Sequence, residues 1–191
     1  DYPEALARTV ELANRATFKL DQLNPTLPSY QFGDDERVLK QKVWEGAKER
    51  YGDRLGDKHV RQLKHELHVI TQLELSGYFL IVSDIVDYAR SRDILVQGRG
   101  SAANSAVCYC LGITAIDPIE MDLLFERFLS EGRTDPPDID IDIAHLQREE
   151  VLQYVYRKFG RRHAAMVCTT ITWRGKSAIR DVARVLGMSS E

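Results

Sequence analysis

Residues 136–143 read Pro-Pro-Asp-Ile-Asp-Ile-Asp-Ile, and this strict alternation of acid and isoleucine decides how the chain folds around it. Successive side chains in a β-strand point to opposite faces of the sheet. The stretch therefore predicts a strand with its acids on one face and its isoleucines on the other. The isoleucine face is expected to be buried, which would hold the acid face in a fixed position.

The acid face consists of Asp138, Asp140 and Asp142. Alternate residues of a strand lie roughly 6.5–7 Å apart at Cα, so their carboxylates can converge on a shared cation. Ligands that are all oxygens suit Mg²⁺, or Mn²⁺ in its place, better than Zn²⁺. The alternative is a strand whose outer face is merely solvated, but aspartate is disfavoured in strands and like charges on one face repel. The pattern thus predicts a metal site for phosphate chemistry.

A second motif, Gly-Arg-Gly-Ser-Ala-Ala-Asn-Ser at residues 98–105, lies between an apolar stretch at 94–96 and a predicted helix that ends near Gly112. A strand, a glycine-serine turn and a helix N-terminus can bind an anion, because its oxygens approach the backbone and face free N–H groups. Ser101 can cap the helix or donate to a phosphate, and Arg99 adds positive charge. The motif is not a Walker loop. The alternative is that the turn only caps the helix. The aspartate strand favours phosphate binding instead, because its acids could bind the metal ion that accompanies the phosphate.

Length, charge and cysteine content bound the class of protein. The 191 residues can build one hydrophobic core and the edge of another. The net charge of −3 is unusual for a stand-alone nucleic-acid binder, for which a basic balance is expected. No apolar run of roughly 18 residues and no signal peptide is present, so a cytoplasmic protein without a membrane segment is predicted. Cys108, Cys110 and Cys168 suit reduced, buried thiols, and they lack zinc-site spacing.

Apolar periodicity and capping residues predict a largely helical chain. Asp117 followed by Pro118 predicts an N-cap and the start of a helix, and residues 164–172 predict a β-rich stretch. His65 and His68 lie on the polar side of one predicted helix, where a solvated face is favoured over a metal site. The expected helices span residues 3–18, 35–51, 58–76, 79–90, 148–159 and 176–187.

Several motifs, in one order along the chain, resemble the palm of bacterial C-family DNA polymerases, which include the DNA polymerase III alpha subunit. They are residues 77–82 (Gly-Tyr-Phe-Leu-Ile-Val), 98–105, 111–114 (Leu-Gly-Ile-Thr), 123–129 (Leu-Leu-Phe-Glu-Arg-Phe-Leu) and 137–142. The resemblance is dense from about residue 60 onward.

Within that family the chain resembles the error-prone branch. The replicative pattern has glycine at the position of Asn104, and often at that of Ala102. Ile143 departs from the phenylalanine common in the family, a change expected to alter packing under the site and not the metal ligands.

The resemblance implies roles for residues that match the family's motifs. The catalytic pair falls on Asp138 and Asp140, and Asp142 is a further candidate metal ligand on the same face. The residues expected to bind the triphosphate are Arg99, Gly100, Ser101 and Arg127. For Arg127 the alternative is a helix-surface residue paired with a nearby acid. Basic residues expected to contact DNA, or else to form a plain solvated face, are Arg174, Lys176, Arg180 and Arg184.

The predicted fold is α+β: a nucleotidyltransferase-type, polymerase β-like palm with a small mixed sheet flanked by helices, then the start of a helical thumb. Residues 1–34 would link the palm to a preceding PHP domain, 35–168 would form the palm, and 169–191 would begin the thumb. The implied function is error-prone, template-directed DNA synthesis across lesions, which adds dNMP to a primer 3′-OH with two Mg²⁺ or Mn²⁺ ions. The implied partners are primer-template DNA, dNTP, a sliding clamp and accessory mutagenesis proteins.

Three alternatives remain beside this reading. The first is the replicative DNA polymerase III alpha subunit. The second is a stand-alone nucleotidyltransferase, although its acids usually follow the Gly-Ser turn within about a dozen residues. The third is a helical scaffold or DNA-binding module whose acids bind a structural cation. Since the family's third catalytic carboxylate lies downstream of the pair, we expect this chain to be an inactive fragment of a longer polymerase.

Overall fold

The computed structural model describes residues 2–17, 19, 30, 34–130 and 137–188. The chain divides into two compact units, Asp1–Gln153 and Tyr154–Glu191, each of which is described by itself. The predicted metal and triphosphate residues all lie in the first unit, and the basic candidates lie in the second. Parts of the predicted linker between residues 18 and 33 lie outside the described residues, and so does Pro136 before the aspartate strand.

The helix predicted over residues 35–51 is confirmed as α2 (Asp35–Tyr51). Its buried side chains recur every four residues, which places them on one face of the helix. Gly52 ends α2 with a positive φ of 51°, a conformation that glycine adopts at low cost. The buried apolar side chains of this face are Leu39, Val43, Ala47 and Tyr51.

The two helices predicted over residues 58–76 and 79–90 are confirmed, although the first ends four residues earlier than expected. They are α3 (Asp57–Gln72) and α4 (Ser76–Ser91), and Glu74 between them has a φ of 55°. No single helix in the described part of the chain is long and apolar enough to cross a membrane; only α3 and α4 taken together, across a 114° bend, have the length and composition.

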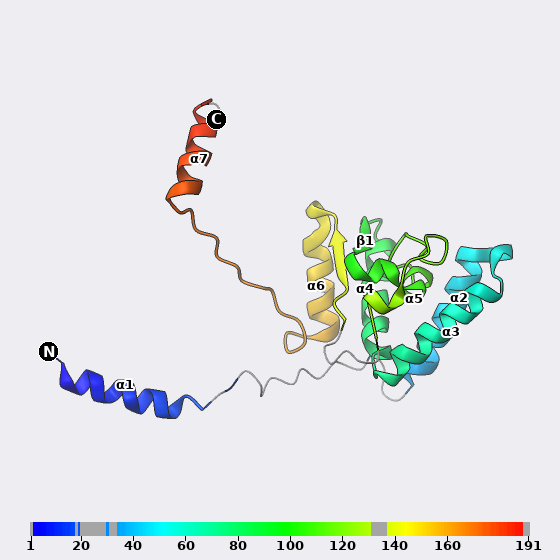
Figure 1. The fold of residues 1–191 in the computed structure, drawn as a ribbon, viewed down its shortest axis with the longest axis horizontal. Helices are drawn as coiled ribbons and strands as arrows, with labels where there is room; N and C mark the ends of the chain where they lie inside the picture. The colour runs from blue at the N-terminus through cyan, green and yellow to red at the C-terminus, as the bar shows by residue number, and fades with distance from the viewer. Residues whose placement is uncertain (1, 18, 20–29, 31–33, 131–136, 189–191) are drawn as a thin grey trace. The chain divides into compact units, whose positions relative to one another are not determined.

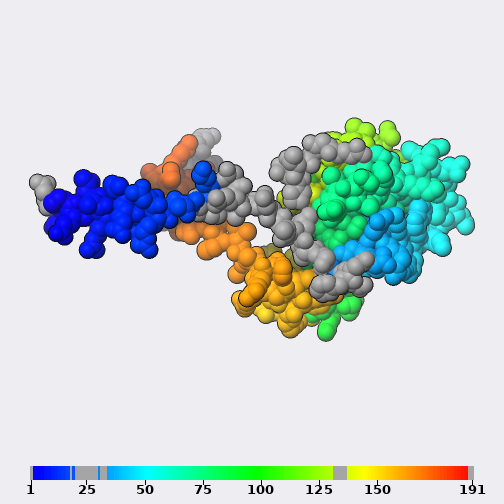
Figure 2. Space-filling model, turned by 90° about the horizontal axis from the view of Figure 1, so that it is seen from below, coloured from blue at the N-terminus to red at the C-terminus, as the bar shows by residue number. Residues whose placement is uncertain are grey.

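A short helix, α5 (Ala106–Cys110), lies at the centre of the first unit and is buried along its whole length. Both α2 and α3 contact it, while α4 contacts α2 and the sheet. In Figure 1 α2 and α3 lie together on one side of this unit, and Figure 2 shows their atoms in cyan as a surface continuous with the green segments. Gly46 allows the contact of α2 with α5, because a Cβ there would lie 1.9 Å from the Cys110 carbonyl oxygen.

The described residues contain one sheet, formed by β1 (Val96–Arg99) and β2 (Asp140–Ile143). The strands are antiparallel, with Gly98 opposite Ile141 and Arg99 opposite Asp140. The predicted strand is therefore confirmed from Asp140 onward, whereas Asp138 precedes it. The sheet is antiparallel where a mixed sheet was expected.

The isoleucines of the aspartate stretch lie against the core, as the alternation predicts. Ile139 is buried in the main core and Ile141 packs against it. Ile143 packs instead against a small cluster of Ala89, Ile94 and Val151. Val151 belongs to α6 (Arg148–Phe159), the helix predicted over residues 148–159.

Elsewhere the structure departs from the sequence pattern. Residues 164–172, predicted to be β-rich, contain no strand. Asp117 caps a turn and not a helix: its Oδ1 accepts from the backbone N–H groups of Ile119 and Glu120 at 3.0 and 3.3 Å.

The remaining helices and 3₁₀ turns are α1 (Pro3–Arg15), η2 (Gly52–Arg54), η3 (Gly100–Asn104), η4 (Phe125–Arg127), η5 (His145–Gln147) and α7 (Gly175–Val185).

Candidate active site

The carboxylates of the aspartate stretch share one side of the segment around β2. Asp140 is half-buried, and Asp138 and Asp142 are exposed. Ile139 and Ile141, which alternate with them, face the core. The acids are therefore presented to solvent by a backbone that the isoleucines hold in place.

Arg99 lies across the sheet from these carboxylates. Its Nη2 is 3.8 Å from Oδ2 of Asp140, and its Nε is 3.2 Å from Oδ1 of Asp142. The guanidinium thus offsets the repulsion between two like charges on one strand. Arg99, which was predicted to bind the triphosphate, therefore lies at the acids themselves, because the register of the antiparallel pair places it opposite Asp140.

The glycine-serine turn continues directly from β1 as η3. Gly100, its first residue, has a φ of 69°, and a Cβ built there would lie 3.6 Å from Oδ2 of Asp140. Ser101, which is half-buried, follows it, and the Nδ2 of Asn104 donates to the Ser101 carbonyl oxygen at 3.0 Å. The two motifs, nearly forty residues apart in the sequence, therefore meet at Gly100 and Asp140.

The structural alternative for Ser101, a helix cap, is not what the structure shows, because Ser105 caps the helix. The α-helix begins after η3, and the Ser105 hydroxyl accepts from the backbone N–H of Cys108 at 3.1 Å. The free N–H groups of the helix are not available to phosphate, since the buried side chain of Glu66 accepts from those of Ala106 and Val107, each at 3.0 Å. Phosphate binding at this motif is thus restricted to the turn itself.

Glu66 is a site residue that the sequence reasoning missed. Its carboxylate is fully buried and also accepts from the Ser105 hydroxyl at 2.8 Å and the Gln62 amide at 2.9 Å. Burial raises the pKa of Glu66, and the hydrogen bonds from Val107, Gln62, Ala106 and Ser105 lower it. Since its partners all donate, the ionised carboxylate is the form that satisfies them. The available signal was a charged residue on the apolar side of a helix, three residues after Leu63.

Tyr78, in the first turn of α4, is a second missed residue. Its hydroxyl oxygen accepts from the backbone N–H of Ile139 at 3.2 Å. Burial raises the pKa of Tyr78, the hydrogen bond from Ile139 lowers it, and the nearby carboxylates of Asp138 and Asp140 raise it further. The phenol therefore contacts the residue that lies between the two predicted catalytic acids.

Arg127 is exposed at the end of η4, between two fully buried aromatic side chains. The ring of Phe128 packs edge-on against those of Phe125 and Phe79, with centroids 6.3 and 6.0 Å away. Among the described residues Arg127 has no ion-pair partner, so the alternative of a paired surface residue finds no support there. Because η4 contacts η3, Arg127 belongs to the segment next to the turn.

The donor set around β2 fits a hard divalent cation that draws further ligands from a substrate. The nearby side-chain donors are carboxylate oxygens, which Mg²⁺ prefers. Within the described residues no group of three or more His, Cys, Asp or Glu side chains lies close enough together to hold a metal ion. The expected convergence of Asp138, Asp140 and Asp142 on one cation is therefore not seen in this structure.

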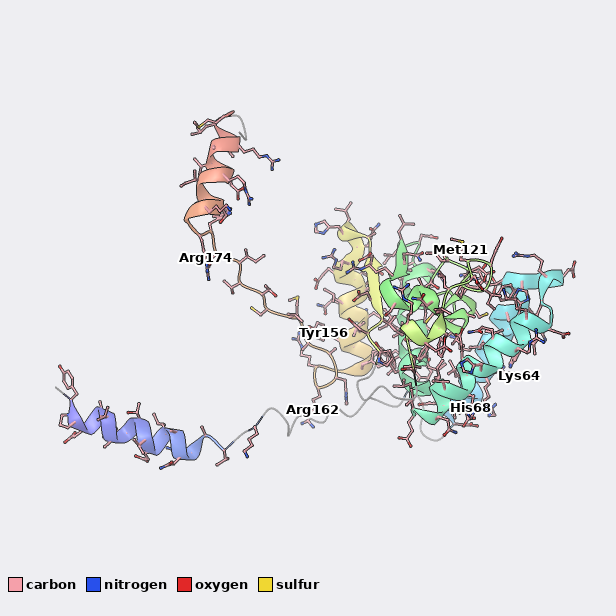
Figure 3. All side chains as sticks on the ribbon, in the orientation of Figure 1. Lys64, His68, Met121, Tyr156, Arg162 and Arg174 are labelled. Atoms are coloured by element: carbon pink, nitrogen blue, oxygen red, sulfur yellow. The ribbon has the colours of Figure 1, made fainter. Side chains whose placement is uncertain are left out.

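The other titratable candidates lie outside this site. His65 and His68 are exposed on α3, where His68 projects beside Lys64 (Figure 3), and the Nε2 of His65 lies 3.3 Å from Glu126. Cys108 and Cys110 are buried as predicted, and burial raises the pKa of Cys110 to about 12. Cys168 is exposed, so the prediction that all the thiols are buried is wrong.

The basic candidates lie on the second unit. Arg174 immediately precedes α7 (Figure 3), and its backbone N–H donates to the Ser177 hydroxyl at 3.1 Å. Lys176, Arg180 and Arg184 are all exposed on α7, and the Nε of Arg180 lies 3.7 Å from Asp181. The helix predicted over residues 176–187 is thus confirmed as α7, and its three basic residues recur every four positions.

Comparison with known proteins gives a consistent result. Residues 37–191 match the family model of the bacterial DNA polymerase III alpha NTPase domain. The error-prone DNA polymerase of Mycobacterium tuberculosis (strain H37Rv) is 53% identical over 98% of this chain and 17% of the relative. Those of Bradyrhizobium sp. (strain ORS 278) and Methylococcus capsulatus (strain Bath) are each 50% identical, over 100% and 98% of this chain and 17% and 18% of their own lengths. The chain thus spans less than a fifth of these relatives.

Proposed function

The chain belongs to the bacterial DNA polymerase III alpha family, and from this premise we propose that it supplies part of the catalytic palm of an error-prone DNA polymerase. The intact enzyme would add dNMP to a primer 3′-OH under the direction of a template. We propose translesion synthesis after DNA damage as its role. The relatives that support the error-prone branch are named error-prone DNA polymerases.

One observation carries the proposal: the turn and the carboxylates are adjacent. A Cβ placed at Gly100 would lie 3.6 Å from Oδ2 of Asp140. Polymerisation requires the triphosphate and the acids to be close together, because each phosphate that the turn binds must also face the cation that the acids bind. Separate locations for the two motifs would have argued against nucleotidyl transfer.

In the proposed reaction the chain's residues bind and orient the nucleotide. Gly100 lacks a Cβ, so a phosphate can approach the backbone of the turn closely. The Ser101 hydroxyl donates to a phosphate oxygen, and Arg127 contributes positive charge from the adjacent 3₁₀ turn. Arg99, now shared by Asp140 and Asp142, is within reach of the same space and is expected to contact the triphosphate when a cation takes its place at the acids.

Asp138 and Asp140 would hold two divalent ions, with Asp142 as a further ligand. When bound, such ions lower the pKa of the primer hydroxyl and neutralise charge on the leaving pyrophosphate. We propose Mg²⁺ as the ion, since all the donors are carboxylate oxygens. We propose that the third carboxylate of the family's site is supplied from outside this chain, so that the chain by itself is inactive.

Further partners follow from the same proposal. The polymerase would bind primer-template DNA, with Arg174, Lys176, Arg180 and Arg184 as phosphate contacts from the start of a helical thumb. It would be recruited by a sliding clamp and by accessory mutagenesis proteins.

The test is primer extension by a polymerase of the relatives' full length that contains this chain. Asp140→Asn should abolish incorporation, because it removes a charged metal ligand while leaving the shape of the side chain nearly unchanged. Asp53→Asn, at an exposed position of η2, is the matched control and should retain full activity. Near-normal incorporation by Asp140→Asn would refute the assignment.

A further inference from the structure

Tyr78 makes a hydrogen bond at the point where the aspartate stretch leaves the sheet. The ladder ends at the pair Arg99 and Asp140, so the N–H of Ile139 has no partner strand. Ile139 is nevertheless buried, with 9% of its surface exposed. A buried N–H requires an acceptor, and the Tyr78 hydroxyl oxygen provides it at 3.2 Å.

The N–H of Ile139 belongs to the peptide plane that joins it to Asp138. Because a peptide unit is planar, fixing this N–H also fixes the direction in which the backbone enters from Asp138. Asp140 follows on the other side of Ile139 and is already held by the ladder. The Tyr78 hydrogen bond is therefore the contact that sets Asp138, outside the strand, relative to Asp140, inside it.

Tyr78 is itself well placed to act as a fixed support. It lies in the first turn of α4, beside the fully buried Phe79, whose ring meets the Tyr78 ring edge-on at 6.2 Å and 90°. Its hydroxyl oxygen contacts the backbone of the residue that lies between Asp138 and Asp140. The support thus reaches from the core helix to the backbone between the two acids.

We infer that Tyr78 is a positioning residue, which holds Asp138 and Asp140 at the separation that a divalent cation requires. The inference rests on the proposed function of these acids. Tyr78 acts through the Ile139 backbone and contacts neither cation nor nucleotide. Its loss should therefore weaken metal binding without removing a ligand.

The test compares two tyrosine-to-phenylalanine variants that each lose one hydrogen bond. Tyr78→Phe keeps the ring and removes the acceptor of Ile139. Tyr51→Phe is the matched control, because the buried Tyr51 hydroxyl donates to Oδ1 of Asp117 at the same 3.2 Å, away from the acids. Tyr51→Phe should lose at least as much stability as Tyr78→Phe, since it loses a hydrogen bond to a carboxylate whereas Tyr78→Phe loses a neutral one.

The first readout is amide hydrogen exchange of Ile139, measured by NMR on this chain. Tyr78→Phe should speed its exchange, and Tyr51→Phe should leave it unchanged. The second readout is the Mg²⁺ concentration that gives half-maximal primer extension by the full-length polymerase. Tyr78→Phe should raise it on the order of fivefold, the effect of one lost hydrogen bond, while Tyr51→Phe leaves it unchanged.

Each outcome decides the inference. Unchanged Ile139 exchange in Tyr78→Phe would overturn it, and so would faster exchange with an unchanged requirement for Mg²⁺. An equal shift in Tyr51→Phe would also overturn it, because the effect would then follow from general stability. Failure of the proposed function is distinguishable, since it would appear as activity retained by Asp140→Asn.

Discussion

A methyl group at Gly98 tests the packing that brings β1 and β2 to the site. Gly98 is buried in β1, and its N–H donates to the Ile113 carbonyl oxygen at 2.7 Å. A Cβ there would lie 2.6 Å from that same oxygen and 2.9 Å from Cγ2 of Ile113. Because the nearest atom is backbone, a side-chain rotation cannot relieve the contact, and β1 must move away from Ile113.

The size of the effect follows from three contributions. Overpacking a tight site costs about 1–3 kcal/mol, and moving β1 lengthens a hydrogen bond whose loss costs about 1 kcal/mol. Replacing glycine recovers about 0.4–1 kcal/mol by restricting the unfolded chain. Gly98→Ala should therefore lower the free energy of unfolding by about 1–3 kcal/mol.

Urea denaturation followed by tryptophan fluorescence measures this change. Trp44 on α2 packs against the core of the first unit, and a Trp173→Phe background removes the exposed tryptophan of the second. Gly56→Ala is the control, because the nearest atom to its Cβ is 3.9 Å away. Gly56 is the N-cap of α3, where alanine is less favourable than glycine, but restriction of the unfolded chain offsets this cost, so the free energy of unfolding should change by no more than about 0.5 kcal/mol. Equal stability of Gly98→Ala and the parent would refute the close contact between β1 and Ile113.

Two further predictions concern buried ionisable groups. Glu66→Gln should lower the free energy of unfolding by about 2–4 kcal/mol, because an NH₂ group would then face backbone N–H donors. Urea denaturation measures this loss, and Glu120→Gln, at an exposed position, is the control. An equal loss of stability in both variants would contradict the prediction. Burial raises the pKa of Cys110 from 9.0 to about 12, so the neutral thiol is favoured in the folded state and stability should fall as the pH rises from 9.0 toward about 12. Cys110→Ala should show a smaller fall, and an identical pH dependence would contradict the assignment.

The helices were predictable where burial repeats at helical spacing. The buried positions of α2, four residues apart, mark both the helix and its inner face. The separation of α3 from α4 was predicted, but the exact position of the bend was not, because Glu74 adopts a positive φ without the glycine or asparagine that usually marks such a position. The turn at Asp117 looked like a helix start, since an acid that caps a turn and one that caps a helix accept from the same N–H groups.

In the candidate site, the residue types were predictable and their partners were not. Alternation places the acids on one side of β2 from local sequence alone. The contact of Arg99 with Asp140 and Asp142 depends on the register between two strands that are far apart in the sequence. Glu66 likewise binds N–H groups that follow it by about forty residues, so only the folded chain shows why an acid occupies an apolar face.

The two proposed halves of the site are supported by neighbouring helices, and this explains why the bend between those helices matters. Glu66 of α3 holds the residues that follow the turn, and Tyr78 of α4 holds the residue between Asp138 and Asp140. The break at Glu74 joins α3 to α4 at 114°. The distance from turn to carboxylates therefore depends on the angle between these helices as well as on the pairing of β1 with β2. The site's geometry is thus set by the helical core, and the short sheet alone does not determine it.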